Sequence, residues 1–263
     1  MADQQEDDMT QATSYDSDDF IRIVKNRGTV PVSQIMSRAV AKAHYDTLYE
    51  PIGGGGTGWQ TVSETWTRTG NHTFTVSTDL TTKYQKGTKV RYKDGGSFEY
   101  GVIGAATYSS PNTTVTLITN TDYAMAAGSI TDTAISYQAS PQGFPGWFNW
   151  EPSPTGYSVA STYVARWIAQ GKAITLAFSF ITGGTSNATT FSMTSPIVAA
   201  TITNMVWRAV LGQVFDNGAS LTTPGRCAIS SASSTINLFT NMASGAWTAA
   251  LGKGAIFQLT YEF

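Results

Sequence analysis

The residues that could carry chemistry are few and scattered. Glu151 and Asp216 are acids of the kind that glycosidases use in pairs, and Glu151 lies between Trp150 and Pro152, where an aromatic ring could stack on a sugar. Such a pair acts only at a set carboxyl separation, and the sequence alone does not place the two acids. We therefore predict no catalytic residue and a protein that is not an enzyme.

The other reactive side chains do not form a recognisable site. His44 and His72 have no partner at a useful spacing, and Cys227 is the single cysteine, which we expect to be buried as a small apolar residue. Because clustered His and Cys ligands are missing, we expect neither a metal nor a cofactor. The glycine run at residues 53–56 is not followed by Lys-Ser or Lys-Thr, so it is not a phosphate-binding loop.

The one concentration of positive charge lies between residues 83 and 93. Lys89, Arg91 and Lys93 alternate with apolar residues, so their side chains should share one face of a hairpin. This face either is solvated or meets an acidic surface, such as an anionic glycan or a neighbouring protein. We treat these three residues as a candidate face for an anionic partner.

The composition argues against several classes of protein. Only 13% of the residues are charged, while the chain holds 39 Thr and 25 Ser, which suits β-sandwiches and fibrous adhesins more than a metabolic enzyme. The formal net charge of −2 argues against nucleic acid as a partner. No apolar run is long enough for membrane insertion and no secretion signal is visible, so we expect assembly in a cytoplasm.

A head is expected over residues 1–57. An acidic tail and a strand-like run at residues 20–25 lead to the one convincing helical pattern, which predicts a helix over residues 33–48. Its docking or trimer-forming face comprises Val32, Ile35, Met36, Val40 and Ala43. The four glycines at residues 53–56 then predict a flexible linker, with one irregular loop inside a single domain as the alternative.

Two β segments follow the head. Residues 58–146 alternate at period two, with hairpin-turn chemistry at Asp94-Gly95, and predict a small antiparallel barrel or sandwich. Residues 147–263 repeat the pattern, most clearly at residues 255–263, and predict a jelly-roll-like C-terminal sandwich. The predicted fold is therefore mainly β: a short N-terminal helix followed by two antiparallel β domains.

A proline-rich run at residues 143–154 joins the two β segments. It carries four large aromatic residues, which we call the aromatic seam: Phe144, Trp147, Phe148 and Trp150. Proline excludes a helix or a central strand here, and so much aromatic surface is rarely left in water. We interpret the seam as an inter-domain or inter-subunit packing cluster rather than a sugar-binding platform.

Several short stretches carry a resemblance. They include residues 108–116 (YSSPNTTVT), 121–123 (TDY), 141–147 (PQGFPGW), 165–167 (ARW), 171–172 (GK), 184–191 (GTSNATTF), 216–218 (DNG), and 24–28 (VKNRG) before 30–33 (VPVS). On these stretches the chain resembles appendage proteins of tailed bacteriophages, namely tail fibres, tailspikes and head fibres. The resemblance implies a trimeric, virion-attached protein with its N-terminal part on the particle and its C-terminal domain distal. It implies no catalytic set, and the repeat of a long β-helix is not visible.

The expected function is that of a phage structural protein. The resemblance implies a homotrimeric fibre or spike that docks on other virion proteins, of the tail or the capsid, and attaches to a host-surface glycan or protein. Its location would be the virion, after assembly in the host cytoplasm. Two alternatives remain open: a capsid or tail cement protein with no receptor role, and a small glycan-cleaving tailspike.

Overall fold

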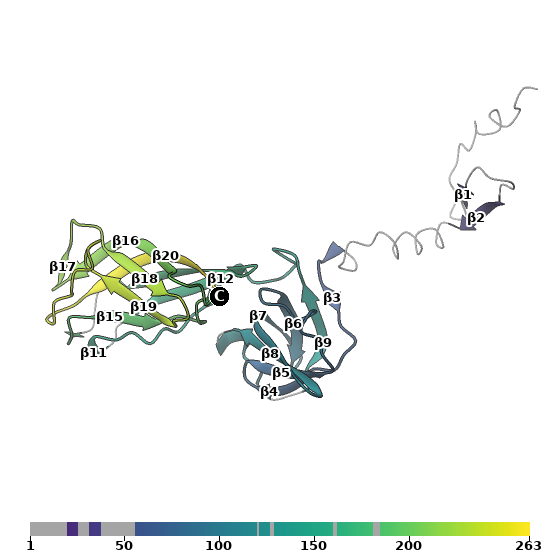
Figure 1. Ribbon diagram of the computed structural model, residues 1–263, viewed down its shortest axis with the longest axis horizontal. Coiled ribbons are helices and arrows are strands. Elements are labelled where there is room, and N and C mark those ends of the chain that lie inside the picture. Colours follow the sequence, from purple (N-terminus) through teal and green to yellow (C-terminus); the bar gives the residue numbers. More distant parts are fainter. Residues whose placement is uncertain are drawn as a thin grey trace, which may run out of the picture. The chain divides into compact units, whose positions relative to one another are not determined.

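The protein is mainly β, and two antiparallel sheets form its main architecture. The computed structural model describes residues 20–25, 32–37, 56–119, 121–126, 129–159, 162–180 and 185–263 (Figure 1). The chain divides into two compact units, Met1–Gly54 and Gly55–Phe263. The division falls inside the glycine run that predicted a linker.

The first unit contains a short antiparallel hairpin. Strand β1 (Phe20–Lys25) pairs with β2 (Val32–Ser37), with Phe20 opposite Ser37 and Lys25 opposite Val32. The prediction of a helix over residues 33–48 is therefore wrong at its start. Six residues cannot separate a helical from an alternating pattern, and pairing with a neighbouring strand overrides weak local propensity. The rest of that predicted helix lies outside the described residues.

A seven-stranded sheet begins the second unit. Its strands are β3 (Gln60–Thr61), β4 (Thr67–Gly70), β5 (Thr73–Ser77), β6 (Lys89–Asp94), β7 (Ser97–Ser109), β8 (Asn112–Ile118) and β9 (Thr131–Ser136). They lie in the order β3-β9-β6-β7-β8-β5-β4, and the sheet curves into a half-barrel (Figure 1). A single 3-10 turn at Thr121–Tyr123 follows β8, and the described residues contain no α-helix.

Turn chemistry and alternation explain the centre of this sheet. Asp94 pairs with Ser97 across Gly95 and Gly96, whose φ angles of 62° and 99° suit a tight hairpin. Behind the hairpin, alternate side chains enter a core that includes Trp66, Phe74, Tyr84, Val90, Tyr92, Ile103, Val115 and Ile135. The predicted antiparallel hairpin is confirmed.

The second sheet has nine strands. They are β10 (Phe148–Asn149), β12 (Val164–Gln170), β13 (Ala173–Phe180), β15 (Phe191–Thr194), β16 (Val206–Asp216), β17 (Ala219–Ser220), β18 (Arg226–Ser230), β19 (Thr235–Phe239) and β20 (Gly254–Glu262). The order is β10-β12-β13-β20-β16-β18-β19-β15, with β17 paired to β16. A separate pair joins β11 (Tyr157–Val159) to β14 (Thr185–Ser186).

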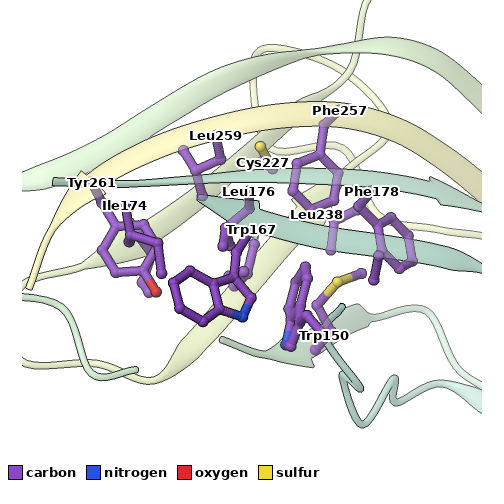
Figure 2. Close-up of a cluster of buried hydrophobic side chains, with 14 of the residues drawn as sticks. Trp150, Trp167, Ile174, Leu176, Phe178, Cys227, Leu238, Phe257, Leu259 and Tyr261 are labelled. Carbon is purple, nitrogen blue, oxygen red and sulfur yellow. The ribbon is translucent and has the colours of Figure 1, made fainter. Parts of the chain in front are cut away.

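Strand β16 converts this sheet into two facing layers. Its first half, as far as Val210, pairs with β18, whereas Leu211 and the residues after it pair with β20. The register shifts between Leu211 and Gln213, and a bulge of this kind bends a strand. One hydrophobic core therefore receives side chains from both halves, such as Trp167, Leu176 and Phe257 facing Cys227 and Leu238 (Figure 2).

The terminal strand shows how the alternation selects this core. Leu259, Tyr261 and Phe263 are buried, whereas Thr260 and Glu262 between them are exposed. The predicted domain boundary at residue 146 falls between β9 and β10, so each sheet comes from one predicted β segment. Separate domains stay a prediction, because Gly55–Phe263 forms one compact unit.

Candidate ligand-binding cleft

The aromatic seam lies where the two sheets meet. Phe148 is stacked on Trp167 with 4.4 Å between ring centroids, and it also contacts the rings of Tyr123 and Phe144, at 5.3 and 5.5 Å. Tyr123 and Phe144 in turn contact Tyr100 of the seven-stranded sheet. The seam therefore connects rings from both sheets.

The members of the seam differ in burial. Phe148 and Trp150 are 1% and 5% exposed, whereas Trp147 is 41% exposed. Phe148 belongs to β10, and the backbone N–H of Trp150 donates to the carbonyl oxygen of Ala165 at 3.0 Å. These contacts pair the segment with strand β12.

A cleft of about 260 Å³ opens beside this segment. It is lined by His72, Thr119, Asn149, Trp150, Glu151, Trp167, Thr194, Ser195 and Pro196. These residues come from the ends of strands of the seven-stranded sheet, from the seam, from β12, and from the end of β15 with the turn after it, so they are brought together only in the tertiary structure. The indoles of Trp150 and Trp167 lie almost fully buried in its wall.

The polar lining is positioned by neighbouring groups. The Nδ2 of Asn149 donates to Oδ2 of Asp122 at 2.7 Å, which leaves Oδ1 of Asn149 as an acceptor. The Oγ of Ser195 donates to the carbonyl oxygen of Ile197 at 2.7 Å, and the Oγ1 of Thr194 accepts from the backbone N–H of Ser153 at 2.9 Å. The cleft wall is therefore built from oriented polar groups.

Glu151 is the one formally charged residue among those lining the cleft. Burial and then the nearby charge of Glu151 raise the pKa of the Tyr163 hydroxyl. The other acid considered from the sequence, Asp216, does not line the cleft. Its carboxylate accepts hydrogen bonds from the backbone N–H and Oγ1 of Thr248, at 2.9 and 2.8 Å, and so holds a loop.

The candidate anionic-partner face is only partly a solvated one. Lys89 is 3% exposed, and its Nζ donates to the carbonyl oxygen of Gln138 at 3.1 Å. Lys93 pairs with Asp132 at 2.6 Å. Neither a solvated face nor an open face for an acidic partner describes Lys89, because its side chain is buried and its Nζ lies 5.3 Å from the ring of Phe144.

Arg91 occupies the centre of that face. Its guanidinium carbon lies 5.0 Å from the ring of Trp59 and 4.6 Å from the ring of Phe98. Its Nε is buried without a hydrogen-bond partner. Cation–π contacts therefore organise this face, and a role in binding an anionic partner stays a prediction.

Two further polar clusters have no clear signal in the sequence. Lys253 is 1% exposed, and its Nζ donates to the carbonyl oxygens of Ala188 and Thr190 at 2.8 and 2.7 Å. The rings of Tyr157, Phe191 and Trp247 surround it at 5.3 to 5.9 Å. Only the tertiary fold shows that this lysine, one of many in the sequence, is buried.

The second cluster lies under the seven-stranded sheet. The hydroxyl of Tyr84 donates to Glu64 and accepts from Nε1 of Trp66 at 2.8 Å, while Lys83 pairs with Glu64 at 2.7 Å. Burial raises the pKa of Glu64, but the hydrogen bonds from Lys83 and Tyr84 outweigh it and hold that pKa below its usual value. This cluster stabilises the fold.

The remaining predicted sites concern the head and metals. Val32, Ile35 and Met36 belong to strand β2, and Val40 and Ala43 lie outside the described residues, so the docking role of all five stays a prediction. Within the described part of the chain there is no group of three or more His, Cys, Asp or Glu residues that could hold a metal ion. Nor does that part contain a helix long and apolar enough to span a bilayer.

Comparison with known proteins identifies no relative. No protein-family model matches the sequence, and no curated protein matches it significantly.

Proposed function

We propose that this chain is a structural and attachment protein of a tailed-phage virion, a homotrimeric fibre or spike without enzymatic activity. The observation that carries the proposal is the cleft beside the aromatic seam, where two buried indoles meet an amide, a carboxylate and hydroxyl groups. A concave site with a few oriented polar groups is the usual form of a ligand site. The Thr- and Ser-rich, weakly charged composition suits a protein that works on a surface.

The proposal gives each segment a role. Residues 1–57 anchor the chain on other virion proteins of the tail or capsid, and the glycines at residues 53–56 absorb differences in orientation. The half-barrel of residues 58–146 and the jelly-roll-like sandwich of residues 147–263 project and meet a glycan or protein of the host surface. The aromatic seam keeps the two β regions together.

Exposed apolar side chains support a trimer. Val164 and Val210 are each 55% exposed, and Met205 and Val206 are 41% and 37% exposed. Apolar residues gathered on the surface often mark protein contacts, and trimerisation would bury such surface. Size-exclusion chromatography with light scattering measures the assembly state; a clean monomer at micromolar concentration contradicts the trimer.

Adsorption separates attachment from the alternative of a cement protein. Phage particles that lack this protein should remain intact and lose adsorption to host cells, and the purified full-length protein should compete with wild-type particles for adsorption. If particles without this protein are unstable, but those that stay intact adsorb normally, the result would favour the cement protein. An antibody against residues 147–263 should label the outer end of an appendage in electron micrographs of intact particles.

Cleavage of a glycan by Glu151 and Asp216 gains no support from their positions. Glu151 lines the cleft, and Asp216 holds the loop at Thr248. Incubation of the protein with host lipopolysaccharide or capsule, followed by gel analysis, should leave the glycan length unchanged. Shortened product would favour the glycan-cleaving tailspike.

A further inference from the structure

The size of the cleft restricts its occupant. At about 260 Å³ it falls below the usual range of roughly 300–1,000 Å³ for pockets that enclose a drug-sized ligand. A single saturated ring with its substituents is of the right order, whereas a longer oligomer would have to extend out of the cleft. The occupant is therefore one ring-sized unit, either free or at the end of a chain.

The charge of the lining selects among such rings. Glu151 is the one acid among the lining residues, and no lysine or arginine accompanies the single histidine there, His72. An anionic ring would therefore meet the like charge of the Glu151 carboxylate. A protonated amine on the ring would instead be attracted to that carboxylate. A hydrogen bond between two charged groups is stronger than one between neutral groups. A ring with an ammonium group would therefore bind with a more favourable free energy than a ring with a hydroxyl in its place.

The remaining lining groups suit a ring with hydroxyl groups. Oδ1 of Asn149 is available as an acceptor because Nδ2 is directed to Asp122. The hydroxyl of Ser195 donates to Ile197 and also contacts the hydroxyl of Tyr261, so toward a ligand it can act only as an acceptor. Trp150 and Trp167 also line the cleft, but at 5% and 0% exposure they offer a ring almost no apolar surface, so polar groups carry the recognition.

The walls of the cleft are held in place before any ligand binds. The turn after β15 is fixed by the bond from the Ser195 N–H to the carbonyl oxygen of Ser234, at 2.8 Å, and by the bond from the Tyr261 hydroxyl to Ile197, at 2.9 Å. On the opposite side Asn149 is held by β10 and by Asp122. A preorganised site loses little free energy to reorganisation on binding.

We propose that this cleft binds the ring of an amino sugar, with the carboxylate of Glu151 pairing with the ring's ammonium group and Asn149 and Ser195 accepting from its hydroxyls. This inference rests on the proposed attachment function for its biological meaning, since an amine-bearing sugar would be the host-surface unit that is recognised. Glu151 is then the residue that sets specificity between amino, neutral and acidic sugars.

The test uses the full-length ¹⁵N-labelled protein and three methyl glycosides, those of glucosamine, glucose and glucuronic acid, at about pH 6.5, where a sugar amine carries its proton. The glucosaminide should bind about tenfold more tightly than the glucoside, the difference expected for a charged hydrogen bond, and the glucuronide most weakly. Amide shifts should change at Asn149, Glu151 and Ser195. Absence of binding, or equal binding of all three glycosides, overturns the proposal.

Substitution separates recognition from structure. Glu151→Gln keeps the shape of the side chain, and it should abolish the preference for the glucosaminide over the glucoside. Glu262→Gln, at an exposed position of β20 that does not line the cleft, should keep it. Circular dichroism confirms that both variants fold. A preference that survives in Glu151→Gln overturns the role of this residue.

A further measurement distinguishes an amino sugar from a lysine side chain as the source of the ammonium group. Nα-acetyl-lysine amide carries an ammonium group without a sugar ring, and it should bind at least tenfold more weakly than the glucosaminide; equal binding overturns the assignment to a sugar. These binding measurements use isolated protein, whereas adsorption is measured with phage particles that lack it. If the isolated protein binds the sugar but its removal does not reduce adsorption, the attachment function alone is refuted. Loss of adsorption without sugar binding would refute this inference alone.

Discussion

Gly87 and Gly171 meet backbone to backbone at the junction of the two sheets. A β-carbon placed on Gly87 would lie 2.2 Å from the carbonyl oxygen of Gly171. Gly87 precedes β6 in the half-barrel, and Gly171 lies in the turn between β12 and β13 of the sandwich. The two sheets therefore approach more closely here than any side chain on Gly87 would allow.

Gly87→Ala should destabilise the protein by about 3 kcal/mol, because the new methyl group meets backbone that cannot rotate away and the φ of 84° is strained for alanine. Urea unfolding measures the change. Gly95→Ala is the matched control, since Gly95 also has a positive φ, of 62°, but nothing lies near its added β-carbon. The control should cost only about 1 kcal/mol. Equal losses in the two variants would refute the close approach of the sheets.

Lys253→Met should destabilise the protein by about 3 kcal/mol, since the carbonyl oxygens of Ala188 and Thr190 would stay buried without their donor. Thermal unfolding followed by circular dichroism measures the loss. Lys86→Met removes the same charge from an exposed position and should change stability by no more than about 0.5 kcal/mol. A Lys253→Met variant as stable as wild type would show that the aromatic cage needs no cation.

The cluster of Glu64, Lys83 and Tyr84 should make stability depend on acid. The pKa of Glu64 is held below its usual value in the folded protein, so the unfolded chain binds its proton first as the pH falls. The stabilisation is complete above the usual carboxyl range and is lost as the pH drops through the lowered pKa. Urea unfolding at a series of pH values from neutral to acid should show a shallower decline in Glu64→Gln than in wild type. The same decline in both proteins would contradict this origin.

Trp147 and Trp150 should respond differently to truncation. Trp150→Ala removes a nearly buried indole from the sandwich core and should cost about 3–5 kcal/mol. Trp147→Ala removes a ring that is 41% exposed and should cost about 1 kcal/mol or less in the isolated chain. The free energy of unfolding and the oligomeric state are measured for both variants. Loss of assembly in Trp147→Ala with little loss of stability would show that Trp147 packs between subunits. A large loss for Trp147 in a monomer would mean that the seam packs within one chain at this position as well.

Much of the β structure could be predicted from local patterns. The alternation of Phe257, Leu259 and Tyr261 with polar residues predicted both the last strand and its buried face, and Asp94-Gly95 predicted the central hairpin. The single cysteine, Cys227, was expected to be buried, and it is; burial raises the pKa of its thiol to about 12. These predictions succeed because side-chain period and turn geometry act over a few residues.

The candidate site could be predicted only in part. The sequence showed Glu151 next to Trp150, where a ring could stack on a sugar, but the seam was interpreted as a packing cluster rather than a sugar-binding platform. It did not reveal that His72, Thr119 and Ser195 join these two residues in one cleft. It also suggested a helix over residues 33–48, whose start instead belongs to strand β2 (Val32–Ser37), paired with Phe20–Lys25 in a hairpin. In both cases the local sequence does not show which distant segment of the chain will lie beside these residues.

The sequence by itself determined that the chain is built of antiparallel strands, and it determined which face of the clearest strands is apolar. The tertiary structure decided which strands pair, that Lys89 and Lys253 are buried, and that Asn149, Glu151 and Ser195 line one cleft. The physical reason is the sequence distance over which each property is determined. Alternation is a property of consecutive side chains, whereas burial of a charge or formation of a cleft depends on contacts between residues far apart in the sequence, such as the bonds from Lys253 to Ala188 and Thr190.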